Sequence, residues 1–384
     1  MNTRKQSSRV AHIAVALFAA AQVAHADAPF FWSLGDLAGG SFHSEAFGIS
    51  DGVISTAGQS LSANGSEAFM WTQSGGMVGL GDLPGGSFGS DAVMSSGGAV
   101  IAGTGQSASG REAYRWTQAT GMVGLGDLSG GSFDSIVDRL SADGSVIVGA
   151  SQSSSGEEAY RWTLAAGMVG LGDLAGGGFS SHAIGVSGDG NVVVGRSESS
   201  LGINEAFRWT QATGMVGLGD LPGGNDASVA TAASYDGSVV VGGGNWGGSG
   251  RQAFRWTQAT GMVALGDLAG GDVDGFANAV NANGSVVGGT SATDVGYEAF
   301  VWDSVHGIRN LKTVLGNEYG LDLSGWTLQQ VTGITADGLT FVGKGINPSG
   351  YTEAWIAHIP EPSSSLLLSL GFATCLFRRR NGRR

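Results

Sequence analysis

The chain has 384 residues, a formal net charge of −13, 70 glycines and one cysteine, Cys375. The negative balance argues against nucleic acid and anionic membrane surfaces as partners, and one cysteine excludes an internal disulfide framework. So many glycines raise the alternative of low-complexity disorder, but aromatic and aliphatic residues recur on a fixed rhythm that argues against it.

The first 26 residues have the three parts of a secretion signal. The positive part contains Arg4, Lys5 and Arg9. Residues 10–23 are mostly apolar, and Ala24 and Ala26 are small residues at the positions that a signal peptidase inspects, which predicts cleavage before Asp27. A membrane anchor is the alternative, but the apolar stretch is shorter than the ~20 residues that a spanning helix needs.

From residue 30 onward, three markers recur together with a period of about 46 residues. The first is Gly-Asp-Leu, with aspartates at 36, 82, 127, 173, 220 and 267. The second is a turn marker, most often Asp-Gly, at 51–52, 97–98, 143–144, 189–190, 236–237, 283–284 and 337–338. The third is a Glu-Ala-aromatic step starting at 67, 112, 158, 205, 252, 298 and 353, where residue 252 is Gln. Seven copies indicate seven repeated units.

Each unit predicts four short strands. In the copy over residues 181–221 they cover 181–187, 191–197, 205–210 and 215–221, and Asp189-Gly190 predicts a two-residue hairpin turn. Four antiparallel strands in a unit of this length are typical of a β-propeller blade, and their order is similar to that of WD-type blades. We therefore expect an all-β, seven-bladed propeller over residues 27–359. One alternative is a β-solenoid, but its repeats are usually shorter. The other is a linear array of small domains, but units of this size can hardly fold on their own.

The ends of the array are complementary. Residues 30–37 resemble a fourth strand without a preceding blade, and residues 353–356 resemble a third strand without a following one. We predict that residues 30–37 pair beside residues 352–358, complete the seventh blade and remove exposed sheet edges.

One tryptophan recurs in each of six units. We expect these tryptophans in the core rather than on a carbohydrate-binding platform; they are Trp71, Trp116, Trp162, Trp209, Trp256 and Trp302. The predicted hairpin register sets Trp116 opposite Val123 and Arg115 opposite Gly124, so that the arginine stem lies flat across glycine. Trp246, in a Gly-rich loop, is the candidate for an exposed contact. In the seventh unit, residues 308–319 predict a short helix or an outer hairpin, with Gly320 as its stop, and Trp326 and Trp355 are expected to cover the closure.

Motifs that carry chemistry are weak. Residues 85–89 match a nucleophile elbow and residues 242–247 match a dinucleotide fingerprint, but neither precedes a helix. The histidines at 43, 182, 306 and 358 lack zinc-ligand spacing. The Gly-Asp-Leu aspartates are expected to accept bonds from the following Gly-rich turn. We therefore predict no catalytic, cofactor or metal residues; calcium at Asp272-Val273-Asp274-Gly275 is a weak possibility because most oxygen ligands of a calcium loop are missing.

The tail begins with Pro360, Glu361 and Pro362, continues with the apolar residues 363–377 and ends in five arginines. It predicts a short hydrophobic helix whose C-terminus stays in the cytoplasm; an ordinary anchor is the alternative. The order resembles the PEP-CTERM sorting signal of Gram-negative, exopolysaccharide-producing bacteria, which implies temporary inner-membrane anchoring and processing by an exosortase-type peptidase. Without the basic residues of both ends, residues 27–362 carry −21.

The recurring Glu-Ala-Phe-Arg-Trp and Gly-Met-Val-Gly-Leu-Gly-Asp-Leu segments resemble the HAF family of bacterial extracellular repeats over nearly all of residues 30–358. This resemblance implies export to the cell surface or extracellular matrix and implies no chemistry. We expect a non-enzymatic binding or structural scaffold that contacts proteins or exopolysaccharide. The alternative is an exported polysaccharide lyase or glycosidase, which should gather acids, bases or aromatic residues at one mouth of the channel.

Overall fold

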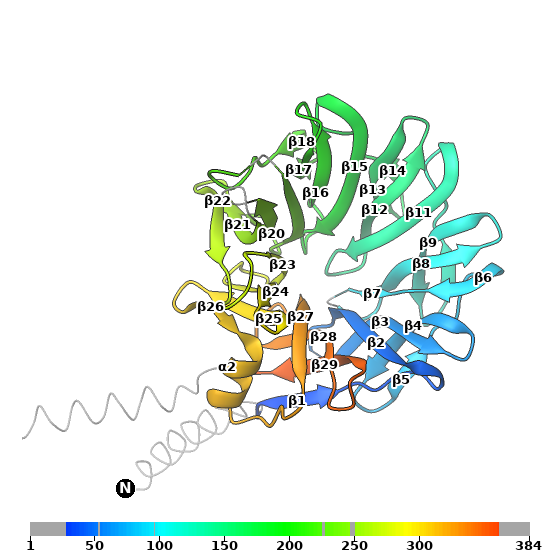
Figure 1. Ribbon diagram of the computed structural model, residues 1–384. Helices are drawn as coiled ribbons and strands as arrows, with labels where there is room; N and C mark the ends of the chain where they lie inside the picture. Colours follow the sequence, from blue (N-terminus) through cyan, green and yellow to red (C-terminus); the bar gives the residue numbers. More distant parts are fainter. Residues whose placement is uncertain (1–27, 53, 96, 225–226, 246–249, 361–384) are drawn as a thin grey trace, which may run out of the picture. The chain divides into compact units, whose positions relative to one another are not determined.

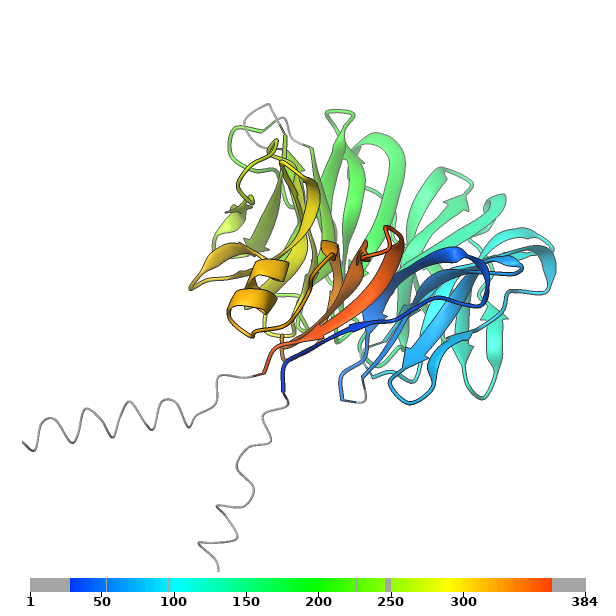
Figure 2. The same ribbon diagram turned by 60° about the horizontal axis from the view of Figure 1, so that its bottom comes forward.

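The computed structural model describes residues 28–52, 54–95, 97–224, 227–245 and 250–360. Residues Phe30–His358 form one compact unit. In it, seven antiparallel sheets form a ring around a central axis (Figure 1), and Figure 2 shows the blades from another side. The predicted seven-bladed β-propeller is confirmed.

In blades 1–6 the innermost strand comes first in the chain, and the outer strands follow. Blade 1 contains β2 (Gly39–Ile49), β3 (Ser55–Ser62), β4 (Gly65–Thr72) and β5 (Gly76–Gly79). Blade 2 contains β6 (Gly85–Ser90), β7 (Val93–Met94), β8 (Ile101–Ser107), β9 (Gly110–Thr117) and β10 (Gly121–Gly124). Blade 3 contains β11 (Gly130–Leu140), β12 (Val146–Ser153), β13 (Gly156–Thr163) and β14 (Gly167–Gly170).

The other blades repeat this plan. Blade 4 contains β15 (Gly176–Val186), β16 (Val192–Ser199), β17 (Asn204–Thr210) and β18 (Gly214–Gly217). Blade 5 contains β19 (Ser228–Ala233), β20 (Val239–Asn245), β21 (Arg251–Thr257) and β22 (Gly261–Gly266). Blade 6 contains β23 (Gly275–Val280), β24 (Val286–Thr293), β25 (Gly296–Asp303) and β26 (Gly307–Asn310). Blade 7 contains β27 (Thr327–Ile334), β28 (Thr340–Ile346), β29 (Thr352–His358) and β1 (Phe30–Ser33).

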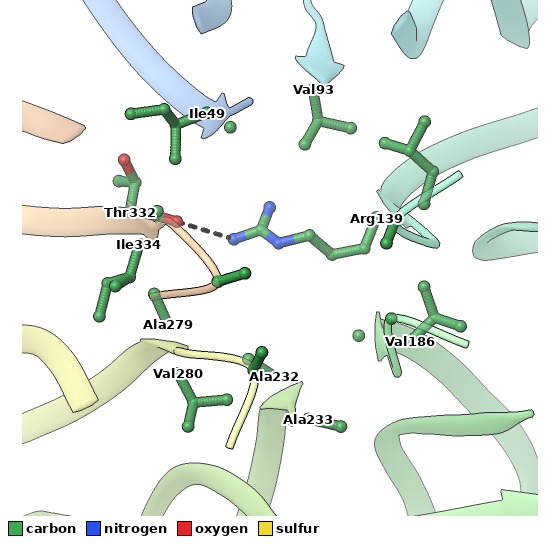
Figure 3. A pocket seen from close by; sticks show the side chains of 18 of the residues that line it. Ile49, Val93, Arg139, Val186, Ala232, Ala233, Ala279, Val280, Thr332 and Ile334 are labelled. Carbon is green, nitrogen blue, oxygen red and sulfur yellow. Dashed lines mark hydrogen bonds between the residues drawn. The ribbon is translucent and has the colours of Figure 1, made fainter. Parts of the chain in front are cut away.

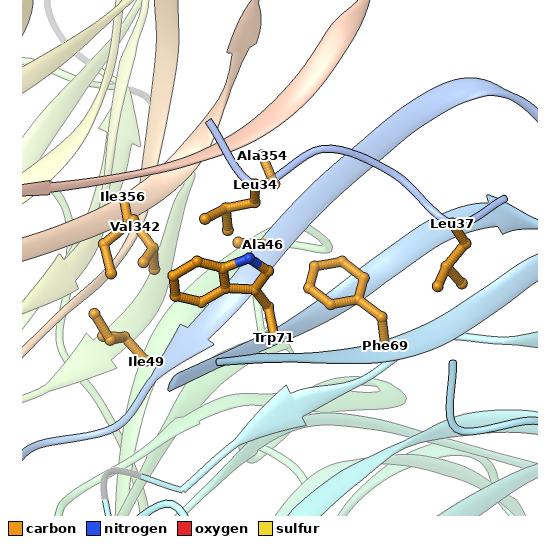
Figure 4. Close-up of a cluster of buried hydrophobic side chains, with 9 residues drawn as sticks. All are labelled: Leu34, Leu37, Ala46, Ile49, Phe69, Trp71, Val342, Ala354 and Ile356. Carbon is orange, nitrogen blue, oxygen red and sulfur yellow. The ribbon is translucent and has the colours of Figure 1, made fainter. Parts of the chain in front are cut away.

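Blade 7 is closed by the first strand of the chain, as predicted. β1 pairs with β29, and Phe30 lies opposite His358. The predicted aromatic cover is present: the Phe31 ring lies 5.2 Å from that of Trp326 and 6.2 Å from that of Trp355, measured between centroids. Behind this closure a buried apolar cluster joins blades 7 and 1 (Figure 4), and it includes Leu34, Ile49, Phe69, Trp71, Val342 and Ile356. Because blades 7 and 1 both bury apolar side chains in this cluster, it stabilises the closure of the ring.

The repeated tryptophans lie in or against the core. Trp71 and Trp162 are buried, and the other four are partly buried against the apolar clusters between blades. Their predicted role is confirmed.

The register predicted for the outer hairpins is wrong by one residue. Trp116 lies opposite Met122, and Arg115 lies opposite Val123. The loop holds only three residues before Gly121, whose φ of +65° is in the left-handed region that favours glycine, so the chain turns back earlier than predicted.

The repeated arginines, expected to lie across glycine, reach the next blade instead. In blade 3, the Arg161 Nη2 donates to the carbonyl oxygen of Gly190 in blade 4 at 3.2 Å. The outer strand has a glycine, Gly124, for a reason unrelated to the arginine. A Cβ on Gly124 would lie 2.2 Å from Oε1 of Glu112, because this carboxylate packs flat against the outer strand.

The Asp-Gly turns are wider than the predicted two-residue hairpins. In blade 4 the N–H of Ser187 bonds the carbonyl of Val192 at 2.9 Å, so four residues form the loop. Asp189 accepts bonds from the Ser187 hydroxyl at 2.6 Å and the Asn191 N–H at 3.0 Å. These side-chain bonds satisfy the polar groups of a longer loop.

A glycine in the second strand of every blade accommodates the inner strand. Next to each glycine the inner strand shifts its register, and one of its carbonyl oxygens points at the place where a Cβ would be. That Cβ would lie 1.9 or 2.0 Å from the oxygen at all seven positions, Gly58, Gly103, Gly149, Gly195, Gly242, Gly289 and Gly343. The bulge therefore requires glycine at these sites.

The predicted short helix is α2 (Leu311–Asn317). It begins where Asn310 accepts a bond from the Thr313 N–H, and Gly320 (φ +68°) follows it. Leu311, Val314 and Leu315 are buried, as their spacing predicts. No helix among the described residues has the length and apolarity needed to cross a bilayer; the predicted helix of the tail lies outside those residues.

Candidate functional site

The inner strands enclose a cavity of about 160 Å³ on the propeller axis. Figure 3 shows that its walls are mostly aliphatic, and every blade contributes to them. One lining residue from each blade, in chain order, is Ile49, Val93, Leu140, Val186, Ala232, Val280 and Ile334. Such a concave apolar space with few polar groups is the usual form of a small-molecule site.

Arg139 breaks the apolar lining. It leaves blade 3 near the end of β11, and its guanidinium extends across the cavity toward Thr332 of blade 7 (Figure 3). Nη2 donates to the Thr332 carbonyl at 3.4 Å, and Nη1 donates to the Asp138 carbonyl at 3.1 Å. Arg139 is the only basic residue among the described residues that line the cavity.

Asp138, the carboxylate adjacent in sequence, is paired elsewhere. Its Oδ2 lies 2.7 Å from Nε2 of His182 in β15, and Nδ1 of the same histidine lies 3.0 Å from Oε1 of Glu157 in β13. Burial lowers the pKa of His182, but the hydrogen bonds and charges of both carboxylates outweigh it and raise this pKa to about 9. The imidazolium therefore pairs with both carboxylates at neutral pH. Arg139 makes no ion pair with a described residue.

Asp91 of blade 2 is a second buried carboxyl group near these charges. Its Oδ1 accepts a bond from the Thr104 N–H at 2.9 Å. Burial raises its pKa to about 6, against the lowering effect of the Thr104 bond, and the charge of Asp138 adds to the increase.

The mouth of the cavity is formed by the turn loops. Backbone N–H groups of one loop donate to carbonyl oxygens of the next at 2.8–3.1 Å, and these bonds run from Gly97 to Ala142, Ala142 to Gly188, Asp189 to Tyr235, Tyr235 to Ala282, and Ala282 to Ala336. Ala336 N–H then donates to Asp51 Oδ1 at 2.7 Å. The mouth is acidic, with Asp51, Asp143 and Asp189 around one hollow, and the Ser145 N–H and Ser141 hydroxyl hold the pKa of Asp143 below its ordinary value.

The repeated carboxylates have structural roles. Asp82 accepts bonds from the N–H groups of Leu83 and Gly89, as predicted for the Gly-Asp-Leu marker. The repeated glutamate also binds this segment: Glu112 Oε1 accepts from the Gly126 N–H at 3.0 Å, and the same bond recurs at Glu67, Glu158, Glu205 and Glu353.

The weak calcium candidate is occupied by an ion pair. Both carboxylate oxygens of Asp274 accept bonds from Arg251, at 3.0 and 3.3 Å, and the Tyr297 hydroxyl also contacts this carboxylate. No group of three or more His, Cys, Asp or Glu side chains among the described residues is placed to hold a metal ion.

The other predicted site residues lie largely outside the described residues. These are Trp246, the cleavage residues Ala24, Ala26 and Asp27, and Glu361 and Pro362 of the sorting motif. Pro360, the first residue of that motif, directly follows the propeller.

Sequence reasoning missed the charged residues of blades 2–4. Asp91, Asp138, Arg139, Glu157 and His182 were not predicted as site residues. For Arg139 the sequence does contain a signal, because this residue departs from the repeat. Four residues before the turn marker, the other units have Phe, Val, Gly or Ala.

Comparison with family models and with curated proteins gives no match. Solved structures share the fold at low identity. The β-propeller domain of the Trilobed protease from Pyrococcus furiosus is 9% identical with a TM-score of 0.50, and the alignment covers 82% of this chain and 94% of that one. TolB from Acinetobacter baumannii is 11% identical with a TM-score of 0.43, over 83% of this chain, which spans only 64% of that TolB. A chain of the Mitotic Checkpoint Complex is 14% identical with a TM-score of 0.49, over 85% and 93%. At such identity, the likeness to the Trilobed protease domain shows the propeller fold alone.

Proposed function

We propose that this protein is an exported, non-enzymatic binding or structural scaffold of the cell surface or extracellular matrix, with contacts to proteins or exopolysaccharide. The observation that carries the proposal is the composition of the axial cavity. Among the described residues that line it, Asp51 is the one carboxyl group. Asp143 and Asp189 lie with it at the mouth, but all three accept hydrogen bonds that tie the turn loops together. The pKa values of Asp143 and Asp189 are lowered, whereas the acid of a glycosidase needs a raised one.

The acid–base residues that do depart from the repeat form a structural cluster. Between blades 3 and 4, the His182 imidazolium pairs with both Asp138 and Glu157. Buried ion pairs of this kind hold neighbouring elements in a fixed arrangement, and their removal destabilises the fold. This favours a rigid scaffold over the alternative of an exported lyase or glycosidase.

Export and processing belong to the same proposal. The signal over residues 1–26 and the tail over residues 360–384 would direct secretion, transient inner-membrane anchoring and release in a Gram-negative-type bacterium. Signal peptidase and an exosortase-type peptidase would be the processing partners. Intact-mass measurement of the protein from its native host should give an N-terminus at Asp27 and loss of the residues after Pro362. An unprocessed chain of 38.6 kDa would contradict this part of the proposal.

The binding role is tested with the purified protein on a glycan array and, in parallel, in a screen for polysaccharide hydrolysis and elimination. We expect retention on at least one neutral glycan without chain cleavage. Because the body carries −21, retention should be weakest on sulfated and uronate-rich glycans at low salt. Cleavage of any polymer would replace the scaffold with the enzyme. Absence of glycan retention would leave protein contacts as the scaffold's role, to be tested by cross-linking on intact cells.

A further inference from the structure

The axial cavity presents one cation to an apolar space. We propose that it binds a small aliphatic monocarboxylate, with the Arg139 guanidinium as the anchor of the carboxylate group. This inference goes beyond the scaffold role and does not depend on it, because that role concerns the outer surface and the loops.

The first argument is the unbalanced charge. A guanidinium carries five N–H donors, and Arg139 uses two bonds, both with backbone carbonyls of Asp138 and Thr332. Burial lowers the pKa of Arg139, and the charge of Asp138 only partly opposes this. A desolvated guanidinium without a carboxylate in contact is costly, and a carboxylate that accepts the free N–H groups in a bidentate manner would remove much of that cost.

The second argument is the asymmetry of the ring. In the strand register, the six positions equivalent to Arg139 carry Gly48, Val93, Gly185, Ala232, Ala279 and Gly333. Five of these six are glycine or alanine, and all six line the same cavity. The inner strand therefore folds with small apolar residues at this position, and its structure does not require an arginine there. The small residues leave space beside the guanidinium (Figure 3).

The walls and the volume define the rest of the ligand. Val93, Val186, Val280 and Ile334 surround the space in front of the guanidinium with aliphatic groups (Figure 3). The cavity volume of about 160 Å³ is below the ~300–1,000 Å³ of sites for drug-sized ligands, so the ligand must be small. A carboxylate with a short aliphatic chain, such as butyrate, matches both the volume and the apolar walls.

The acidic mouth limits the charge of the ligand. Asp51, Asp143 and Asp189 surround the hollow outside the cavity. Their repulsion grows with each negative charge on an entering molecule, so sulfate, phosphate and polyanions are disfavoured relative to a monoanion.

Titration calorimetry of the full chain with sodium butyrate tests the proposal, with butyramide as the uncharged analogue and sodium sulfate at matched ionic strength as the divalent one. Wild type should bind butyrate and raise its melting temperature, and it should respond to neither control compound. Arg139→Met keeps the side-chain volume and removes the charge, and it should weaken butyrate binding at least tenfold. Arg139→Lys should retain part of the affinity. Arg115→Met, which removes a repeated arginine outside the cavity, is the matched control and should bind as wild type does.

Three results would overturn the proposal. The first is an equal response to butyrate and butyramide, and the second is no response of wild type to butyrate. The third is undiminished butyrate binding by Arg139→Met. If Arg139→Met does not fold, the contrast between butyrate and butyramide on wild type and on Arg139→Lys still decides. A wild type that ignores butyrate while Arg139→Met only lowers the melting temperature would make Arg139 a structural tie between blades 3 and 7.

Discussion

Replacement of Gly195 by alanine tests the physical reason for the seven strand glycines. The new Cβ would lie 1.9 Å from the carbonyl oxygen of His182 and 3.0 Å from Cα of Ala183. Both atoms belong to the backbone of β15, so no side-chain rotation can relieve the contact. Because β15 is the inner strand, its displacement would disturb the packing of blade 4 against its neighbours.

The expected cost follows from overpacking. Extra methylene groups in well-packed interiors cost about 1–3 kcal/mol, and a contact with backbone belongs at the upper end of that range. For a unit of this size, a loss of about 3 kcal/mol corresponds to a decrease of roughly 4 °C in melting temperature. Differential scanning calorimetry and urea unfolding of Gly195→Ala beside wild type would measure both quantities.

Gly316→Ala is the matched control. Gly316 lies inside α2, and the nearest atom to its added Cβ would be 3.8 Å away. Alanine in a helix interior is favoured over glycine by about 1 kcal/mol, so this variant should equal or exceed the stability of wild type. If Gly195→Ala unfolds at the same temperature and urea concentration as wild type, the close approach of the His182 carbonyl does not explain the glycine.

Three further changes have directions set by the structure. The pKa of His182 is raised from 6.5 to about 9, so its stabilising effect is complete below pH 6.5 and is lost as the pH rises through 9. In urea unfolding, wild type should lose up to about 3 kcal/mol of stability over this range, and His182→Gln should not. An unchanged alkaline loss in the variant would contradict the ion cluster. The pKa of Asp91 is raised from 3.8 to about 6, so the fold loses stability as the pH rises from 3.8 to about 6, and the loss is complete above that pH. Asp91→Asn should be more stable than wild type at pH 7 by up to about 3 kcal/mol, and the difference should vanish near pH 4. Equal gains at both pH values would refute burial as the cause. Deletion of residues 28–33 exposes the edge of β29, so we expect a lower melting temperature and self-association in size-exclusion chromatography; a monomer of wild-type stability would contradict the closure.

The fold could be predicted because it depends on features that repeat. The spacing of the turn markers and of the Glu-Ala-aromatic step determines the number of blades, and the unmatched strand at residues 30–33 identifies its partner in β29. The register and the loop length of individual turns were not predicted correctly. The outer hairpin register depends on whether the loop has three or four residues, and that depends on the φ of Gly121, which the sequence does not show.

The charged residues of the site could not be recognised in the same way. In a linear reading, Asp138-Arg139 resembles an ordinary solvated pair on a strand. Asp138 meets His182 across 44 residues of sequence, and Arg139 reaches Thr332 across 193. Only the closed ring brings these positions to one axis. An inspection of where single copies depart from the repeat would have singled out Arg139, though not its partners.

The split blade also determines the order in which the protein can fold. Blades 1–6 are each made from consecutive strands, so each can form by local contacts as soon as its segment is available. The seventh must join residues as distant as Gly35 and Glu353, which are 318 positions apart, and closing a loop of that length costs about 5 kcal/mol of chain entropy. The seam is therefore the last step of folding, and until residues 352–358 are in place β1 has no sheet to join. A chain that folds from its N-terminus onward must keep this strand from pairing with other molecules until residues 352–358 are available.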